Sequence, residues 1–166
     1  MDLRVMEESA YVVRELILRD VTVATAESLT GGQVAASITG VPGSSEAFLG
    51  GVVAYATEVK IAVLGVPEEL VERHGVISSE CAEAMATGVR ELIGATYGIA
   101  TTGVAGPADQ EGKPPGTVFV AVAGPDGVEA AQLSPQGNRT QIQLASVEGV
   151  LSLLLGILRR EEPSVG

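Results

Sequence analysis

The spacing of apolar residues near the start of the chain predicts a helix followed by a buried strand. Five apolar positions recur at helical spacing: Val5, Val12, Val13, Leu16 and Ile17. Residues 21–26 (VTVATA) are then apolar and β-branched enough for a buried strand. A second helix is expected to begin near Gly31.

The middle of the chain alternates turn signals with short apolar runs. Residues 41–45 (VPGSS) indicate a loop, and residues 50–55 (GGVVAY) predict another strand. A short helix is expected through residues 60–64, and Pro67 opens a further helical turn that Gly75 ends.

The next helix has a clear capping signal, because Ser78 or Ser79 can accept hydrogen bonds from first-turn N–H groups. This helix is expected to run to about Ile93, and residues 97–102 (YGIATT) predict a strand after it.

The remainder of the chain predicts a long loop, a hairpin and a final helix. Residues 105–116 (AGPADQEGKPPG) lack any period, and a loop of this length is often functional. Apolar runs on either side of residues 125–127 (PDG) predict an antiparallel hairpin. Residues 138–160 predict a long helix whose apolar stripe contains Ile142, Ala145, Val150 and Leu154.

Composition narrows the fold class to a layered α/β domain. The chain has 166 residues, of which 46 % are hydrophobic and 21 are glycine, and it has no tryptophan. Small aliphatic residues and many tight turns suit closely packed α/β layers. We expect one domain over residues 1–160 and a flexible tail at 161–166.

The formal net charge of −11 disfavours a basic surface for nucleic acid or anionic membranes. Small molecules or other proteins are therefore the expected partners. Glutamates near the start do not fit a signal peptide, and the apolar run at residues 150–158 is shorter than a membrane span, so we expect a soluble protein. One cysteine cannot form an internal disulfide, which fits the cytoplasm.

Several site chemistries lack the residues that they need. The sequence has no GxxxxGK[ST] phosphate loop, no GxGxxG after a strand, and no GxSxG or SxxK motif. The only histidine, His74, and the only cysteine, Cys81, are too few for a usual zinc site, and no metal is expected. We interpret His74 as a helix-end residue and Cys81 as a core residue.

The most informative segment is AESLTGG, at residues 26–32. Ser28 follows a buried strand, and Gly31 and Gly32 precede a helix, so Ser28 is expected beside unpaired helix N–H groups that can bind an anion. Alternatively, Ser28 or Thr30 only caps the helix.

A serine nucleophile needs a base, and Lys60 is the candidate. It is one of only two lysines and lies between Val59 and Ile61, where burial would lower its pKa toward neutrality. Alternatively, its apolar stem lies along a helix surface and its amine reaches water. Tyr55 could hydrogen-bond in the same cleft or serve as a core ring.

Two further segments could complete the site. Residues 101–107 (TTGVAGP) place glycines after another strand and form a second backbone wall. Arg139, just before the last helix, could hold anionic oxygens with its planar guanidinium, or it could simply be exposed to solvent.

With these motifs in order, the sequence resembles the CinA C-terminal domain family over nearly its whole length. The shared elements are AESLTGG, PGSSEAFLGGVVAY with Lys60, HGVIS, TGVAGP, KPPGTV and GNR. The resemblance implies a three-layer α/β/α sandwich with a mixed, mostly parallel sheet. It also implies hydrolysis of nicotinamide mononucleotide to nicotinate mononucleotide and ammonia by a Ser28–Lys60 pair that Tyr55 assists, without a cofactor.

On this basis, Ser28 attacks the carboxamide carbon and Lys60 carries the proton. N–H groups near Thr30, Gly31 and Gly32, or at Gly103, are expected to hold the oxyanion. Contacts with ribose or phosphate are expected from Ser44, Ser45, Thr102 and Arg139. The alternatives are a nucleotide-binding module without turnover and a hydrolase of another amide or nucleotide.

Some positions depart from the family pattern. Ala56 and Thr57 stand where Ser-Asn is common, Pro115 stands where valine is usual, and Gln141 or Gln143 replaces an arginine that would strengthen phosphate binding. Some members also carry an N-terminal molybdopterin-binding-like domain, whose activity we do not transfer to this chain. The apolar GGVVAY segment and the last helix leave room for a homo-oligomer interface.

Overall fold

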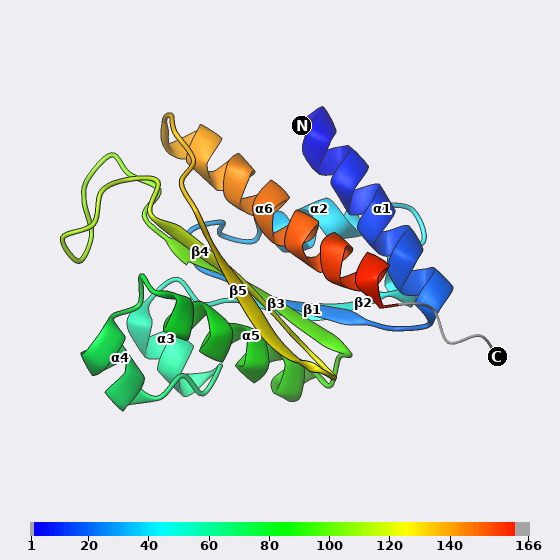
Figure 1. Cartoon of the computed structure of the whole chain (residues 1–166), viewed down its shortest axis with the longest axis horizontal. Coiled ribbons are helices and arrows are strands. Elements are labelled where there is room, and N and C mark those ends of the chain that lie inside the picture. Colours follow the sequence, from blue (N-terminus) through cyan, green and yellow to red (C-terminus); the bar gives the residue numbers. More distant parts are fainter. Residues whose placement is uncertain (1, 162–166) are drawn as a thin grey trace.

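The computed structural model describes residues 2–161, which form six α-helices, one short 3₁₀ helix and five strands (Figure 1). The elements are α1 (Leu3–Arg19), β1 (Val23–Glu27), α2 (Gln33–Thr39), η1 (Ser44–Glu46), β2 (Phe48–Val53), α3 (Thr57–Ala62), α4 (Glu68–His74), α5 (Ser79–Ile93), β3 (Tyr97–Gly103), β4 (Val118–Gly124), β5 (Gly127–Leu133) and α6 (Arg139–Arg160). Of the expected tail, residues 162–166 lie outside the described part of the chain.

The five strands form one open sheet in the order β2-β1-β3-β4-β5. The β1 strand pairs in parallel with β2 and β3, whereas β4 is antiparallel to β3 and β5, so only β4 runs against the others. Helices α1, α2 and α6 cover one face of the sheet, and α3, α4 and α5 cover the other (Figure 1). The expected three-layer α/β/α sandwich with a mostly parallel sheet is confirmed.

Capping side chains begin three of the helices, and one of these caps was predicted from the sequence. The Ser78 hydroxyl accepts a hydrogen bond from the Cys81 N–H at 3.1 Å and caps α5. Asn138 caps α6 through a reciprocal capping box with Gln141. Asp2 caps α1 with its carboxylate, which accepts from the Arg4 and Val5 N–H groups.

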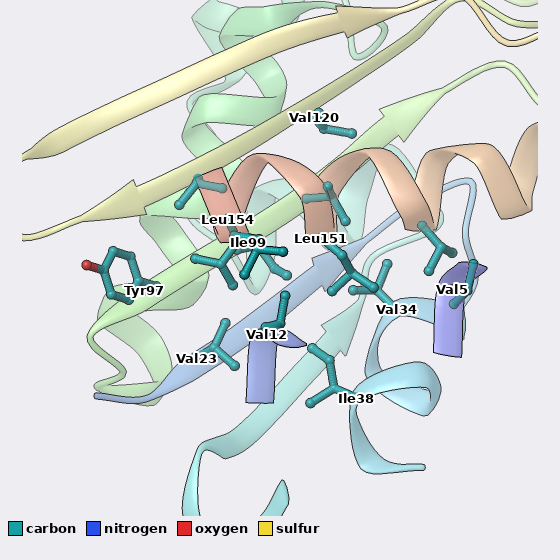
Figure 2. Packing of buried hydrophobic residues seen from close by; sticks show 14 of the residues in the cluster. Val5, Val12, Val23, Val34, Ile38, Tyr97, Ile99, Val120, Leu151 and Leu154 are labelled. Atoms are coloured by element: carbon teal, nitrogen blue, oxygen red, sulfur yellow. The ribbon is translucent and has the colours of Figure 1, made fainter. Parts of the chain in front are cut away.

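Aliphatic residues from α1, α2 and α6 pack on one face of the sheet as the larger core (Figure 2). Val12, Ile38, Leu151 and Leu154 are completely buried there. Of the five apolar positions at helical spacing in α1, Ile17 is 36 % exposed, whereas the other four are buried.

The opposite core contains smaller side chains because α5 approaches the sheet closely. A Cβ atom added to Gly98 on β3 would lie 2.1 Å from the Ala86 carbonyl oxygen, so only glycine fits at this crossing. Alanines, Cys81 and Met85 fill the remaining space.

Helix α6 matches the predicted long helix, but its apolar stretch is longer than the run at residues 150–158 indicated. Its best 18-residue window has a mean hydropathy of 1.6, so length and composition alone would permit a membrane span. Half of that window is buried within the fold, and α6 packs on α1 and β4. These contacts are those of a core helix.

Candidate active site

The carboxyl ends of the parallel strands bring Ser28 and Lys60 together. Ser28 follows β1 directly, and Lys60 lies in the last turn of α3, which follows β2. The Lys60 Nζ is 2.9 Å from the Ser28 Oγ, within hydrogen-bond distance. Ser28 and Lys60, which the sequence could offer only as candidates, are therefore direct partners although they lie 32 positions apart in the chain.

The Lys60 side chain is 1 % exposed, and its other two contacts are backbone carbonyls. Its amine donates to the oxygens of Ala54 at 2.8 Å and Tyr55 at 3.1 Å. No carboxylate forms a salt bridge with Lys60 within residues 2–161. Burial therefore lowers the pKa of the Lys60 amine from its ordinary value of 10.5, although Cys81 and Glu111 act in the opposite direction.

The neutral amine has two N–H groups and one lone pair. When the two N–H groups donate to the carbonyls of Ala54 and Tyr55, the lone pair is left for the Ser28 hydroxyl proton. This arrangement is that of a general base beside a nucleophile.

The N–H groups at the start of α2 are already occupied, which corrects the expected anion site. The buried Glu27 carboxylate accepts from the Val34 N–H at 2.7 Å and the Ala35 N–H at 3.1 Å. The alternative of capping by Ser28 or Thr30 is also wrong, since the Thr30 hydroxyl donates to Glu27 at 2.6 Å. An acidic side chain thus fills the position expected for a substrate anion.

Some of the N–H groups expected to hold the oxyanion are already hydrogen-bonded, and others have no protein acceptor. The Gly31 N–H donates within the turn to the Ser28 carbonyl at 3.0 Å. By contrast, the N–H groups of Leu29, Thr30 and Gly32 donate to no protein atom in the described part of the chain. Positive φ values of 55° at Gly31 and 103° at Gly32 explain why two glycines are needed here.

Ser28 opens into a pocket of about 260 Å³ between the ends of the strands and the long loop. Its lining includes Tyr55, Gly103 and Arg139 together with loop residues 104–110. Arg139 donates to the Tyr55 hydroxyl at 2.9 Å and to the Gly106 carbonyl at 2.5 Å. A tyrosine from the end of β2, a loop carbonyl and the start of α6 therefore form one wall.

The long loop is fastened to the segment between α4 and α5. The Glu111 carboxylate accepts from the Val76 N–H at 3.0 Å and the Ile77 N–H at 2.9 Å. The Lys113 amine donates to the Ile77 carbonyl. These contacts hold the loop beside Ser28 and the buried Lys60.

Two of the predicted substrate contacts, Ser44 and Ser45, lie away from Ser28 in this chain, and the hydroxyl of a third, Thr102, already has a hydrogen-bond partner. Ser44 and Ser45 are in η1, just before β2, at the end of the parallel strands opposite Ser28. The buried Thr102 hydroxyl donates to the Val76 carbonyl at 2.7 Å. Ser44 and Ser45 therefore cannot reach the same small ligand as Ser28 within one chain, and Thr102 has a structural partner.

His74 and Cys81 have the structural surroundings that the sequence favoured. His74 is the exposed last residue of α4, and its Nδ1 is 3.9 Å from a Glu80 oxygen. Cys81 is fully buried, and burial raises its pKa to about 11. No cluster of three possible metal ligands is found among residues 2–161.

Sequence reasoning missed three residues that shape the site: Glu27, Glu111 and Gln143. The Gln143 side chain donates to the Leu29 carbonyl at 2.9 Å, so its amide supports the serine turn. An acidic residue at a strand end just before Ser28 was a usable signal for Glu27. Nothing local distinguishes Glu111 from an ordinary loop glutamate.

A larger hollow of about 790 Å³ lies between α3, α4 and α5, and it contains neither Ser28 nor Lys60. Its lining combines aliphatic residues with Glu80, Glu83 and Glu91. We place the candidate site at the smaller pocket, because Ser28 lines it and the buried Lys60 amine lies 2.9 Å from the Ser28 Oγ.

Known proteins share the sequence pattern and the fold of this chain. A family model described as the CinA C-terminal domain matches residues 6–158. A CinA-like protein of Frankia casuarinae is 51 % identical over 143 residues, covering 86 % of this chain and 33 % of that protein. The chain thus spans about a third of the curated relatives that it matches.

Solved structures match over their full length. The competence damage-inducible protein A from Klebsiella pneumoniae is 33 % identical, with a TM-score of 0.92 over 95 % of this chain and 99 % of that one. A competence/damage inducible protein from Agrobacterium tumefaciens is 32 % identical, with a TM-score of 0.89 over 96 % of this chain and 99 % of that one.

Proposed function

Because this chain belongs to the CinA C-terminal domain family, we propose that it is an amidohydrolase that converts nicotinamide mononucleotide to nicotinate mononucleotide and ammonia. The observation that carries the proposal is the buried Lys60 amine 2.9 Å from the Ser28 hydroxyl. A lysine with a lowered pKa beside a serine is suited to acyl transfer. The identity of the amide rests on the family resemblance.

In the first half of the reaction, Ser28 Oγ attacks the carboxamide carbon while neutral Lys60 accepts the hydroxyl proton. The tetrahedral intermediate then collapses. Its C–N bond breaks, Lys60 returns the proton to the leaving amide nitrogen, and ammonia departs. An ester between Ser28 and the nicotinoyl group remains.

In the second half, water attacks that ester and Lys60 accepts a proton from it. Collapse of the second intermediate breaks the bond to Ser28 Oγ, which recovers the proton from Lys60. Nicotinate mononucleotide leaves, and the enzyme returns to its starting protonation state. No metal or organic cofactor enters the proposed cycle.

The N–H groups of Leu29 and Thr30 are suited to hold the oxyanion, since they follow the nucleophile and donate to no protein atom in the described region. One such donor is typically worth about 3 kcal/mol in the transition state. Arg139 is positioned to hold the phosphate, and Tyr55 orients it through their hydrogen bond.

The deciding test is ammonia release from nicotinamide mononucleotide by the purified protein. We expect wild-type turnover and a loss of at least about 1,000-fold in Ser28→Ala. Ser152→Ala is the matched control, because Ser152 is exposed on α6, and it should retain wild-type activity. Turnover that survives Ser28→Ala would disprove the mechanism.

The same assay separates the remaining functions. Binding of the mononucleotide without ammonia release would indicate a nucleotide-binding module. Faster turnover of free nicotinamide or of the dinucleotide would indicate another amidase. A cytoplasmic location and the absence of a nucleic-acid or membrane partner are further proposals. We also propose a homo-oligomer contact at the edge strand β2, where Leu49 and Val53 are each 49 % exposed.

A further inference from the structure

We propose that Glu27 is the positioning residue for the nucleophile: its carboxylate closes the turn that carries Ser28 and fixes Ser28 Oγ opposite the lysine. This inference rests on the proposed use of Ser28 as a nucleophile. It assigns a role to a residue that touches neither the pocket nor Lys60.

The contacts of Glu27 are numerous for a buried acid. The side chain is 1 % exposed and accepts three hydrogen bonds, from the Thr30 hydroxyl and from the N–H groups of Val34 and Ala35. No arginine or lysine forms a salt bridge with it in the described chain. Hydrogen bonds alone therefore satisfy the buried Glu27 oxygens, which makes an intact donor set important.

These bonds close the main chain into a ring. Glu27 ends β1, whereas Val34 and Ala35 lie in the first turn of α2, whose cap residue Gly32 has no side chain. The carboxylate thus links the strand end to the helix start. Ser28 is the first residue within the ring, so these bonds restrict the movement of its backbone.

Two outside contacts orient the ring relative to the base. The Ser28 N–H donates to the Thr101 carbonyl on β3 at 3.1 Å. From α6, Gln143 donates to the Leu29 carbonyl at 2.9 Å. With both ends fixed, Ser28 Oγ is held at its hydrogen-bond distance from Lys60 before any ligand binds, and reaction rates depend steeply on such placement.

Glu27→Gln tests this role while preserving side-chain shape. An amide has one oxygen acceptor and one NH₂ donor group, so it cannot accept from all three donors around Glu27. At least one donor must face the NH₂ group, and the ring should loosen. Asp2→Asn is the matched control, because Asp2 also caps a helix with a carboxylate but lies on α1.

Two measurements should be made on each protein: kcat and KM for ammonia release, and the rate at which a fluorophosphonate probe labels Ser28. For Glu27→Gln we expect kcat and the labelling rate to fall together by about 10-fold to 100-fold. KM should stay within about twofold, and the pH midpoint of labelling should stay at its wild-type value, since the contacts of Lys60 are unchanged. Asp2→Asn should change none of these.

Wild-type labelling and kcat in folded Glu27→Gln would overturn the proposal, as would a shifted pH midpoint without a loss of maximal rate. If Glu27→Gln does not fold, Thr30→Val removes one donor to the carboxylate. Its labelling rate should fall, and an unchanged rate would also overturn the proposal. A wild-type protein that labels at Ser28 but releases no ammonia would refute the substrate alone, and one that does not label would refute both proposals.

Discussion

The Lys60 Nζ lies 2.9 Å from Ser28 Oγ and donates to the two carbonyls of Ala54 and Tyr55, while no carboxylate pairs with it among residues 2–161. A protonated amine at this place would be a buried charge whose direct hydrogen-bond partners are all neutral, and burial outweighs the opposing effect of Glu111. The site therefore favours the amine form, which is the form that can accept a proton.

The first prediction concerns the pH dependence of activity. Only neutral Lys60 acts as a base, so kcat/KM should rise with pH through the lowered pKa and reach its plateau below 10.5. Lys60→Arg retains the charge but supplies no base, and its activity should fall at least about 100-fold at every pH. A rise centred on 10.5 in the wild type, or near-normal activity in Lys60→Arg, would contradict this assignment.

The same shift predicts a pH-dependent stability. The pKa of Lys60 is lower in the folded state than in the unfolded state, so the unfolded chain binds more protons between the two values. Stability should therefore rise with pH across this window, up to about 10.5. Below the folded pKa the full destabilisation is present.

Urea unfolding of wild type and Lys60→Met from pH 6 to pH 10 would measure this effect. The free energy of unfolding of the wild type relative to the variant should increase with pH. A constant offset from the two carbonyls that lose a donor does not affect the slope. A flat or falling difference would show that Lys60 is not neutralised by folding.

The sequence predicts those features that depend on neighbouring residues, and it does not predict contacts between distant parts of the chain. Ser78, Asn138 and the PDG turn act on their own neighbours, and the predicted cap, long helix and hairpin are present. The pairing of Ser28 with Lys60 depends on β1 and β2 lying side by side, which spacing along the chain cannot reveal.

The expectation that Ser44 and Ser45 would lie beside Ser28 failed for the same reason. Ser44 and Ser45 were assigned without knowing the direction of β2, which places them at its amino end. Thr102 precedes the pocket-lining Gly103 on β3, and its bond to the Val76 carbonyl could be recognised only in three dimensions. Glu27 had to be placed in three dimensions before its bonds to α2 could be recognised.

The third prediction concerns Glu111, whose carboxylate fastens the long loop to the segment between α4 and α5. Glu111→Gln removes a carboxylate that accepts from the Val76 and Ile77 N–H groups, so the pocket wall should loosen and KM should rise about 3-fold to 10-fold. Because Glu111 raises the pKa of Lys60, the acid limb of the kcat/KM profile should also move to lower pH. Glu7→Gln, on the exposed face of α1, is the control. If KM rises but the acid limb of the kcat/KM profile does not move, Glu111 only fastens the loop. If the acid limb moves to higher pH, the electrostatic effect of Glu111 on Lys60 is contradicted.

The fourth prediction concerns Cys81, the only cysteine of the chain. Its thiol is fully buried and has a pKa raised to about 11, so little thiolate exists near neutral pH. Iodoacetamide at pH 7.5 should leave the folded protein unmodified and should alkylate Cys81 fully in guanidinium. Mass spectrometry distinguishes the two results, and rapid alkylation of the folded protein would contradict the core placement.

The last prediction separates phosphate recognition from chemistry at the amide. Arg139 holds the Tyr55 hydroxyl and the Gly106 carbonyl on the pocket wall, and no carboxylate forms a salt bridge with it in the described residues. A guanidinium that bonds only neutral oxygens is not paired with a protein carboxylate, so it can form an ion pair with an anionic ligand. Arg139→Ala should therefore lower kcat/KM for nicotinamide mononucleotide by about 10-fold to 100-fold while changing that for the riboside, which lacks the phosphate, by much less. Equal losses on both substrates would show that Arg139 supports the wall rather than the phosphate.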